Sequence, residues 1–205
     1  MKKISGYVLA GGGSTRFGED KARVIFDGQP MLSRTCELVA AVTGTVHVVA
    51  PQGRYEDLGW PIVADRWRGA GPLGGILTAL YTTAQKAPRC EWNLIVSCDM
   101  PFLTKEFLKF LTENALASEA RGLVPASTKG REPLCACWRT DSADELRAAF
   151  AGGMRRVNDA LKQLRAEVLD EADWKRFDSA GRLFWNMNTV AEYLEAQQIM
   201  EAERS

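Results

Sequence analysis

The stretch ISGYVLAGGGSTRFGEDK, residues 4–21, begins as an apolar run and ends in a charged, glycine-rich loop. The run over 4–10 is short, continuous and closed by glycines, as expected of a buried strand. Glycines let the backbone come close to a ligand and offer it N–H groups. The stretch therefore predicts a strand followed by a ligand-binding loop, and a solvated loop with incidental charges is the alternative.

Short apolar strands alternate with helical segments through about the first 120 residues. The pattern predicts strands over 45–50, 61–65 and 93–97. It predicts helices over about 30–43, over about 73–84, where apolar residues recur at helical spacing, and after Thr104, which is a suitable cap. Such alternation is typical of an α/β, Rossmann-like three-layer sandwich, with helices on both faces of a mostly parallel central sheet.

The second half is less regular. GLVPA (122–126) and EPLCACW (132–138) are expected to be strands, and two cysteines spaced two apart, Cys135 and Cys137, should share one face as buried thiols. Helices should begin near 143 and 190, where Ser142 with Glu145 and Thr189 with Glu192 have the spacing of capping boxes. The length of 205 residues favours a single domain over 1–205.

Composition excludes several classes of function. Lysine plus arginine and aspartate plus glutamate number 26 each, so no overall field favours nucleic acid or an anionic membrane. No apolar run is long enough to span a membrane, and the N-terminal run is too short for a signal peptide. The odd count of 5 cysteines favours a reducing cytoplasm over a disulfide framework. The single histidine, His47, argues against histidine-based catalytic or metal sites.

The glycine-rich loop matches neither of the two common nucleotide-binding motifs. Gly13 and Gly18 have the spacing of a Walker A loop, but Glu19 stands where that motif requires lysine. A dinucleotide fingerprint starting at Gly11 would place Arg16 where a glycine is needed. What remains is a glycine turn close to two cations, Arg16 and Lys21, which together suit a triphosphate.

Other candidate residues also follow predicted strands. Asp99, in VSCDMP, is placed to hold Mg²⁺ that bridges to phosphate oxygens, and Asp65 could bind a nucleotide hydroxyl or base. GAGPLGG (69–75) offers glycines beside a ribose or base, and NMNT (186–189) offers two amides to metal or phosphate. Each is also compatible with an ordinary turn or helix cap. In parallel sheets, however, ligands bind beyond the carboxyl ends of the strands.

With these residues in view, the chain resembles a known family. LAGGGSTRFGEDK is similar to the nucleotidyltransferase signature L-A-G-G-x-S-x-R-M-G-x-D-K. Together with GPLGG, CDMP, REPLCACW and NMNT in that order, it resembles the molybdenum cofactor guanylyltransferases from about residue 4 to 195. The resemblance implies Mg²⁺-dependent transfer of GMP from the substrate GTP to the phosphate of molybdopterin, with Mn²⁺ as an alternative ion. About 1–120 would form the nucleotide-binding half and about 121–205 the molybdopterin-side half.

The resemblance also implies roles for individual residues. Arg16, Lys21 and Asp99 would be catalytic, with Asp99 also the metal ligand. The nucleotide would be bound by Leu9, Ala10, Gly11, Gly12, Lys21, Asp65, Gly71, Pro72, Leu73 and Asp99. Gly12 favours guanine, because the cytidylyltransferase relatives commonly have alanine there. Residues on the molybdopterin side would be Arg131, Pro133, Arg155, Arg156, Asn186 and Asn188.

Three alternatives stay open. A related nucleotidyltransferase would use CTP with molybdopterin, or a nucleoside triphosphate with a sugar or polyol phosphate. A guanine-nucleotide-binding module would bind GTP without releasing pyrophosphate. Protein partners are expected among other cofactor-biosynthesis proteins or acceptor molybdoenzymes.

Overall fold

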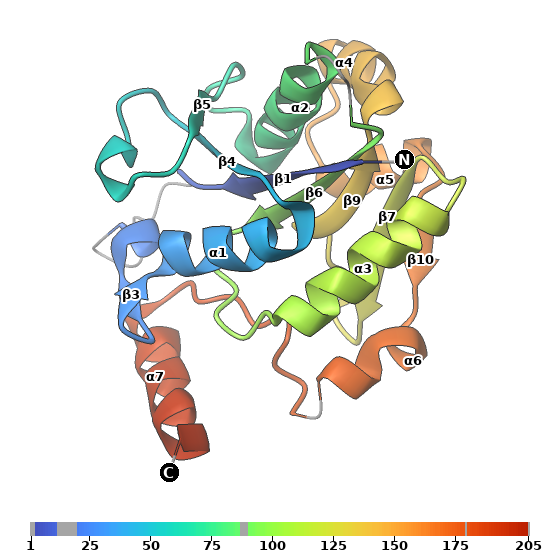
Figure 1. Ribbon diagram of the computed structural model, residues 1–205. Coiled ribbons are helices and arrows are strands. Elements are labelled where there is room, and N and C mark those ends of the chain that lie inside the picture. The colour runs from blue at the N-terminus through green and yellow to red at the C-terminus, as the bar shows by residue number, and fades with distance from the viewer. Residues whose placement is uncertain (1–2, 12–19, 87–89, 179, 205) are drawn as a thin grey trace.

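The computed structural model describes residues 3–11, 20–86, 90–178 and 180–204, and its centre is one eight-stranded sheet (Figure 1). The strand order is β10-β7-β9-β6-β1-β4-β5, with β8 pairing β7. The strands are β1 (Ile4–Leu9), β4 (Val46–Ala50), β5 (Ile62–Ala64), β6 (Trp92–Ser97), β7 (Gly122–Ser127), β8 (Gly130–Arg131), β9 (Cys135–Arg139) and β10 (Glu167–Leu169). Both halves of the chain therefore contribute to the same sheet.

The sheet is mostly parallel, as predicted. Parallel pairing joins β6, β1, β4 and β5, and β10 is parallel to β7. The exceptions are β9, which is antiparallel to both β6 and β7, and the short β8, which is antiparallel to β7. Because β9 separates β6 from β7, the carboxyl ends of the long parallel strands still lie along one edge.

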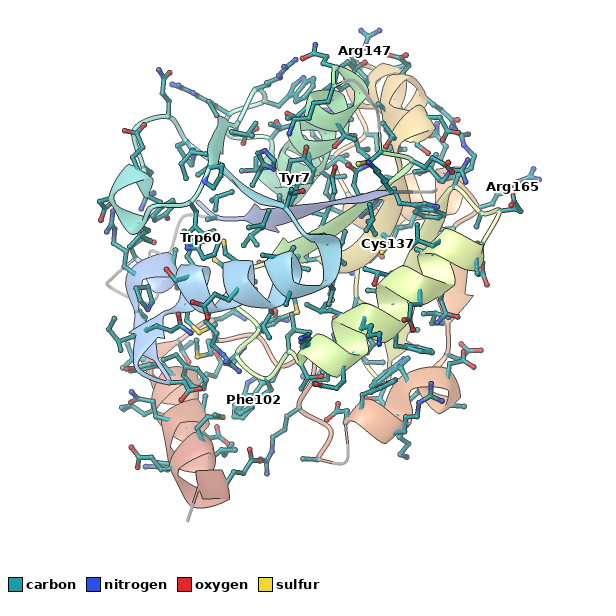
Figure 2. The ribbon with its side chains drawn as sticks, viewed as in Figure 1. Tyr7, Trp60, Phe102, Cys137, Arg147 and Arg165 are labelled. Atoms are coloured by element: carbon teal, nitrogen blue, oxygen red, sulfur yellow. The ribbon has the colours of Figure 1, made fainter. Side chains whose placement is uncertain are left out.

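Helices cover both faces of the sheet. On one face lie α1 (Met31–Thr43), α3 (Lys105–Ala117) and α6 (Glu171–Trp174), and on the other α2 (Gly71–Ala84), α4 (Ala143–Ala151) and α5 (Val157–Gln163) (Figure 1). Figure 2 shows Tyr7 on the α2 side of the sheet and Cys137 on the α3 side. The three-layer sandwich predicted from the sequence is confirmed. Among the described residues, no helix combines the length and apolar character that a membrane span needs.

The chain ends in α7 (Val190–Arg204), which packs beside a small hairpin of β2 (Ile25–Phe26) and β3 (Gln29–Pro30). The hydroxyl of Tyr193 donates a hydrogen bond to the carbonyl of Ile25 at 2.9 Å. The described residues also form four 3₁₀ turns: Lys21–Arg23, Glu56–Leu58, Thr140–Ser142 and Lys175–Phe177. The packing brings the end of the chain against the segment that follows the glycine-rich loop.

The two cysteines of β9 lie on one face, as the alternation predicts. Cys135 and Cys137 belong to the core beneath α1 and α3, whereas Ala136 and Trp138 belong to the core beneath α2. Burial raises the pKa of both thiols well above the ordinary value, which disfavours the reactive thiolate. These cysteines are part of the packing.

The strand expected over 132–138 is wrong at its start. Strand β9 begins at Cys135, because Glu132–Leu134 form a turn in which the N–H of Cys135 donates to the carbonyl of Glu132. Pro133 supplies no N–H to a sheet ladder, so the strand cannot begin earlier without losing a bond. The sequence analysis also did not predict α5, β10 or α6, whose short lengths leave little periodic signal.

One of the two expected capping boxes is formed. Thr189 Oγ1 accepts from the N–H of Glu192, whose carboxylate accepts from the N–H of Thr189 in return, and α7 begins at Val190. Helix α4 does begin at Ala143, but without a side-chain cap. There Glu145 pairs with Arg121, and that partner from another element replaces the expected local cap.

Candidate active site

A cleft of about 570 Å³ lies at the carboxyl ends of the parallel strands. The loops after four of these strands contribute to it: Gly11 follows β1, Pro51 follows β4, Asp65 follows β5 and Asp99 follows β6. This is the edge at which open parallel sheets bind ligands, because the loops there diverge and expose backbone groups. Residues distant in the sequence thus converge on one site.

The structure brings most of the predicted nucleotide-binding residues together. Lining the cleft are Ala10, Gly11, Lys21, Asp65, Gly71, Pro72, Asp99 and Asn188. The side chain of Leu73 lies elsewhere, fully buried in the core beneath α2, and that of Leu9 packs on the same side. Neither side chain lines the cleft. Gly12 and Arg16 lie outside the described residues.

Two glycines of the motifs allow close packing around the cleft. A Cβ on Gly11 would lie 2.5 Å from Cδ of Pro51, and its φ of +122° is one that other residues rarely adopt. A Cβ on Gly75 would lie 3.1 Å from a methyl carbon of Leu9. Glycine therefore lets the β1 loop meet the β4 loop, and lets α2 approach β1.

Lys21 connects the two ends of the chain at this cleft. Its Nζ donates to Oδ1 of Asn188 at 2.9 Å, across 167 residues of sequence. The backbone N–H of Asn188 in turn donates to Glu192 at 2.7 Å, which ties the amide to the start of α7. An ammonium group has three donors, so Lys21 keeps two for an anionic ligand while Asn188 holds it in place.

Asp99 has an unusual carboxylate. Its Oδ1 is buried, yet it accepts no hydrogen bond from any residue in the described part of the chain. The backbone is well held, because the carbonyl of Asp99 accepts from the N–H of Met187 at 2.9 Å. A buried carboxylate oxygen without a donor costs free energy unless a cation or ligand compensates it.

The donor set around Asp99 suits a cation held mainly by its ligand. Within the described ranges, no group of three or more histidine, cysteine, aspartate or glutamate side chains is placed to hold a metal ion. Mg²⁺ commonly binds one or two protein carboxylates and takes its other ligands from water and phosphate oxygens. The orphaned Oδ1 of Asp99 fits such an ion together with a bound triphosphate.

Asp65 forms a turn and is also available for binding. Its Oδ1 accepts from the hydroxyl of Thr78 at 2.9 Å and from the N–H of Trp67 at 3.0 Å. None of the described residues donates to its Oδ2. One oxygen therefore fixes the orientation of the carboxylate, and the other remains for a ligand donor.

Asp20, which was not predicted from the sequence, also lines the cleft. Its Oδ1 accepts from the hydroxyl of Tyr55 at 2.9 Å and from the N–H of Ala22, and its Oδ2 pairs with Arg54. Asp20 thereby anchors the segment that carries Lys21 to the loop after β4. Asp20 stands directly before Lys21 in the quoted signature, and this position could have indicated it as a site residue. Its partners Arg54 and Tyr55 are far away in the sequence, so the contacts themselves could not be predicted.

The expected molybdopterin-side residues are divided. Of these, Asn188 alone lines the main cleft. Arg155 and Arg156 precede α5, and the guanidinium of Arg155 donates to the carbonyl of Phe150 at 2.6 Å. Arg131 lies on β8, Pro133 lies in the turn after it, and Asn186 lies just before α7. These last three do not line a cavity themselves, but they are sequence neighbours of Glu132 and Trp185, which line a second cavity of about 300 Å³.

The fold and the site define an α/β nucleotidyltransferase. The family model described as "MobA-like NTP transferase domain" matches residues 6–168, and the chain belongs to this family. A Nostoc protein called "Probable molybdenum cofactor guanylyltransferase" is 33% identical over 82% of each chain. A "Molybdenum cofactor guanylyltransferase" from Desulfosudis oleivorans is 29% identical over 100% of this chain and 99% of its own.

A solved structure gives the same picture. The crystal structure of "Molybdopterin-guanine dinucleotide biosynthesis protein A" from Archaeoglobus fulgidus is 25% identical and superposes with a TM-score of 0.82. The match covers 97% of this chain and 99% of the other. The similarity thus extends through both halves of the sheet, including the segments that carry Asp99 and Asn188.

Proposed function

We propose that this protein is a molybdenum cofactor guanylyltransferase, which transfers GMP from GTP to the phosphate of molybdopterin and releases pyrophosphate. The observation that carries the proposal is one cleft lined by Lys21 and by Asp99, whose buried Oδ1 accepts from none of the described residues. Full-length relatives named for this activity support the choice of substrates.

The cleft offers separate groups to each part of GTP. Backbone groups of Ala10 and Gly11 face the nucleotide, and Lys21 neutralises part of the triphosphate charge. The free oxygen of Asp65 accepts a donor from guanosine. The resemblance adds Gly12 beside the base and Arg16 beside the triphosphate, both of which lie outside the described residues.

The transfer needs no general base. The second pKa of a phosphate monoester is about 6, so the terminal phosphate of molybdopterin is largely dianionic at neutral pH. One of its oxygens attacks the α-phosphorus of GTP and forms a new P–O bond. The P–O bond to the β-phosphate bridging oxygen breaks, and pyrophosphate leaves with the electron pair. The protein contributes by aligning the two phosphates and stabilising the developing charge.

Asp99 is the residue that would hold Mg²⁺, with Mn²⁺ as an alternative ion. A divalent cation bound there supplies positive charge to phosphate oxygens during transfer. Lys21, held by Asn188, adds a second positive charge that is already oriented before GTP arrives.

The test is a panel of nucleotides. The protein is mixed with Mg²⁺, molybdopterin and each of GTP, CTP, UTP and ATP, and pyrophosphate release is followed. We expect release with GTP and background with the others. Release with CTP alone would indicate a cytidylyltransferase. Tight GTP binding without pyrophosphate release would indicate a binding module and would overturn the proposal.

We also propose that the protein works in the cytoplasm and passes its product to other cofactor-biosynthesis proteins or acceptor molybdoenzymes. All five cysteines are free thiols, four of them buried, which supports a reducing compartment. A pull-down with the product-loaded protein would test for such partners. Recovery of no molybdoenzyme or cofactor-biosynthesis protein would count against direct delivery of the product to them.

A further inference from the structure

A second cavity, of about 300 Å³, lies at the same edge of the sheet as the main cleft. Its walls come from the β7–β8 hairpin, from α6 and from the segment before α7. Such a volume suits a bicyclic or tricyclic ring system rather than a whole nucleotide.

One side of this cavity is aromatic and firmly held. Trp174, Phe184 and Trp185 line it, and Trp174 with Phe184 form an edge-to-face pair at 5.0 Å. The indole N–H of Trp174 donates to the carbonyl of Ala126 at 3.2 Å. Trp185 stacks on Phe102, labelled in Figure 2, with ring centroids 5.6 Å apart. Aromatic walls fixed in this way suit a flat heterocycle.

A carboxylate completes the cavity. Glu132 Oε1 accepts from the hydroxyl of Ser127 at 2.5 Å, and among described residues no donor reaches its Oε2. Burial raises the pKa of this carboxyl group. A half-buried carboxylate with one oxygen fixed and one free is complementary to a pair of N–H donors on a ligand.

The two cavities are neighbours, since two short segments line both. Leu134 lines the main cleft and Glu132 the second cavity, and likewise Asn188 lines the cleft and Trp185 the cavity. Three residues of extended chain span at most about 10 Å, so one extended substrate can occupy both spaces.

We propose that this cavity binds the pterin ring of the second substrate, with Glu132 accepting from the N–H donors of its aminopyrimidinone edge and Trp185 forming an aromatic wall. The inference rests on the proposed function, which requires a flat pterin with a phosphate directed at Asp99. Glu132 and Trp185 then determine which phosphate is accepted, because a sugar or polyol phosphate has no such ring. Neither residue was singled out from the sequence.

The main test compares Glu132→Gln with Glu195→Gln, a control at an exposed residue of α7. The Glu132→Gln side chain can still accept from Ser127, so the fold should be kept. We expect KM for molybdopterin to rise about tenfold in Glu132→Gln, with KM for GTP unchanged within about twofold, as for loss of a ligand's hydrogen bond to a charged group. An unchanged KM for molybdopterin would overturn the inference while leaving GMP transfer intact.

A binding measurement separates this inference from the proposed function. 6-Hydroxymethylpterin carries the ring without a phosphate, and its binding is followed by quenching of tryptophan fluorescence. We expect saturable quenching in the wild-type protein, a reduced amplitude in Trp185→Phe and weaker binding in Glu132→Gln. Quenching that is identical in all three would contradict the assignment. If pterin binds but no nucleotide is transferred, the cavity assignment holds and the proposed reaction fails.

Discussion

Asp99 has a buried carboxylate oxygen that no described residue satisfies, in the turn that follows β6 and lines the cleft. An unsatisfied buried carboxylate is destabilising by itself, so its retention is explained by a ligand or cation. We therefore expect the fold to tolerate its removal while the reaction does not.

The change Asp99→Ala should abolish turnover and leave the fold intact. Removing one group that stabilises transition-state charge commonly costs about 10²–10³ in kcat. Pyrophosphate release measures the loss, thermal unfolding checks the fold, and Asp159→Ala at an exposed position of α5 is the matched surface control. GMP transfer that continues unchanged at saturating Mg²⁺ would remove Asp99 from the mechanism.

Lys21→Ala should weaken GTP binding. The ammonium group is pre-oriented by Asn188 at 2.9 Å, so its loss removes a charge already directed at the cleft. We expect Kd for GTP to rise by about tenfold or more, and binding to become less sensitive to salt, because charge attraction is screened by ions. Calorimetric titration measures Kd, and Lys105→Ala on α3 is the control. Equal GTP affinity in both variants would refute the role.

Thr78 is a positioning residue for Asp65. Its fully buried hydroxyl lies 2.9 Å from Asp65 Oδ1 and 3.0 Å from the carbonyl oxygen of Gly74, and it accepts from the N–H of Arg66. Thr78→Val keeps the shape and removes all of these bonds, whereas Thr78→Ser keeps the hydroxyl. We expect KM for GTP to rise about fivefold to tenfold in the valine variant, with a smaller change in kcat, and serine to restore it. If valine and serine give the same KM, the hydroxyl does not position Asp65.

Among secondary-structure elements, α7 has a direct connection to the cleft. Its first turn holds Asn188 and Thr189 through the carboxylate of Glu192, and Asn188 holds Lys21. The β2–β3 hairpin and α7 pack together through Phe26 and Ala196. The end of the chain therefore supports Lys21 in the cleft.

Glu192→Ala should weaken GTP binding through this helix. Loss of a capping interaction costs about 0.5–2 kcal/mol of stability. We expect a lower melting temperature and a KM for GTP raised about threefold to tenfold, whereas Glu195→Ala should change neither. An unchanged KM for GTP in a correctly folded Glu192→Ala protein would show that the α7 cap does not affect the site.

The same carboxylate makes this cap dependent on pH. Hydrogen bonding from the backbone N–H of Asn188 holds the pKa of Glu192 below its ordinary value. The stabilisation is therefore fully present above the ordinary glutamate pKa, about 4.3, and is lost as pH falls through the lowered value. In acid titrations, the free energies of unfolding of the wild-type and Glu192→Ala proteins should converge below that range. A difference that stays constant with pH would contradict the role of Glu192 in the cap.

Elements with a strong repeating pattern were predictable. The strand at Ile4–Leu9, the helix at Gly71–Ala84 and the cap at Thr189 follow from apolar spacing and from local capping chemistry. The start of β9 was not predictable. The turn around Pro133 is held by a hydrogen bond from Glu132 to Pro125 of β7, which is a contact between separate elements. The bond between Ser142 and the carbonyl of Arg121 was equally hidden, since its partner comes from another element.

At the scale of the whole molecule, the parallel sheet explains why motifs spread from Ala10 to Asn188 form one site. Order along the strands indicated that their loops meet, so Asp65 and Asp99 could be proposed from the sequence. The bond between Lys21 and Asn188 could not, because nothing local relates residues 167 apart. Asp20 and Glu132 were not predicted for the same reason, because their roles depend on contacts that form only in the tertiary structure.

The second cavity extends the cleft along the same edge, so the molecule provides adjoining spaces for two substrates. In the arrangement that we propose, the nucleotide would lie toward β1 and β4, and the pterin would lie toward β7 and α6. The phosphate of the pterin would then reach the α-phosphate of GTP near Asp99. This arrangement predicts direct transfer from one substrate to the other, without a nucleotide attached to the protein.

Transfer of the α-phosphate itself is the most direct test. The protein is incubated with Mg²⁺, molybdopterin and GTP that carries an isotopic label in its α-phosphate. The products are then separated and identified by mass spectrometry. We predict that the label appears in a guanine dinucleotide of molybdopterin and that the pyrophosphate is unlabelled. Label found only in free GMP or GDP, or no labelled dinucleotide at all, would contradict guanylyl transfer.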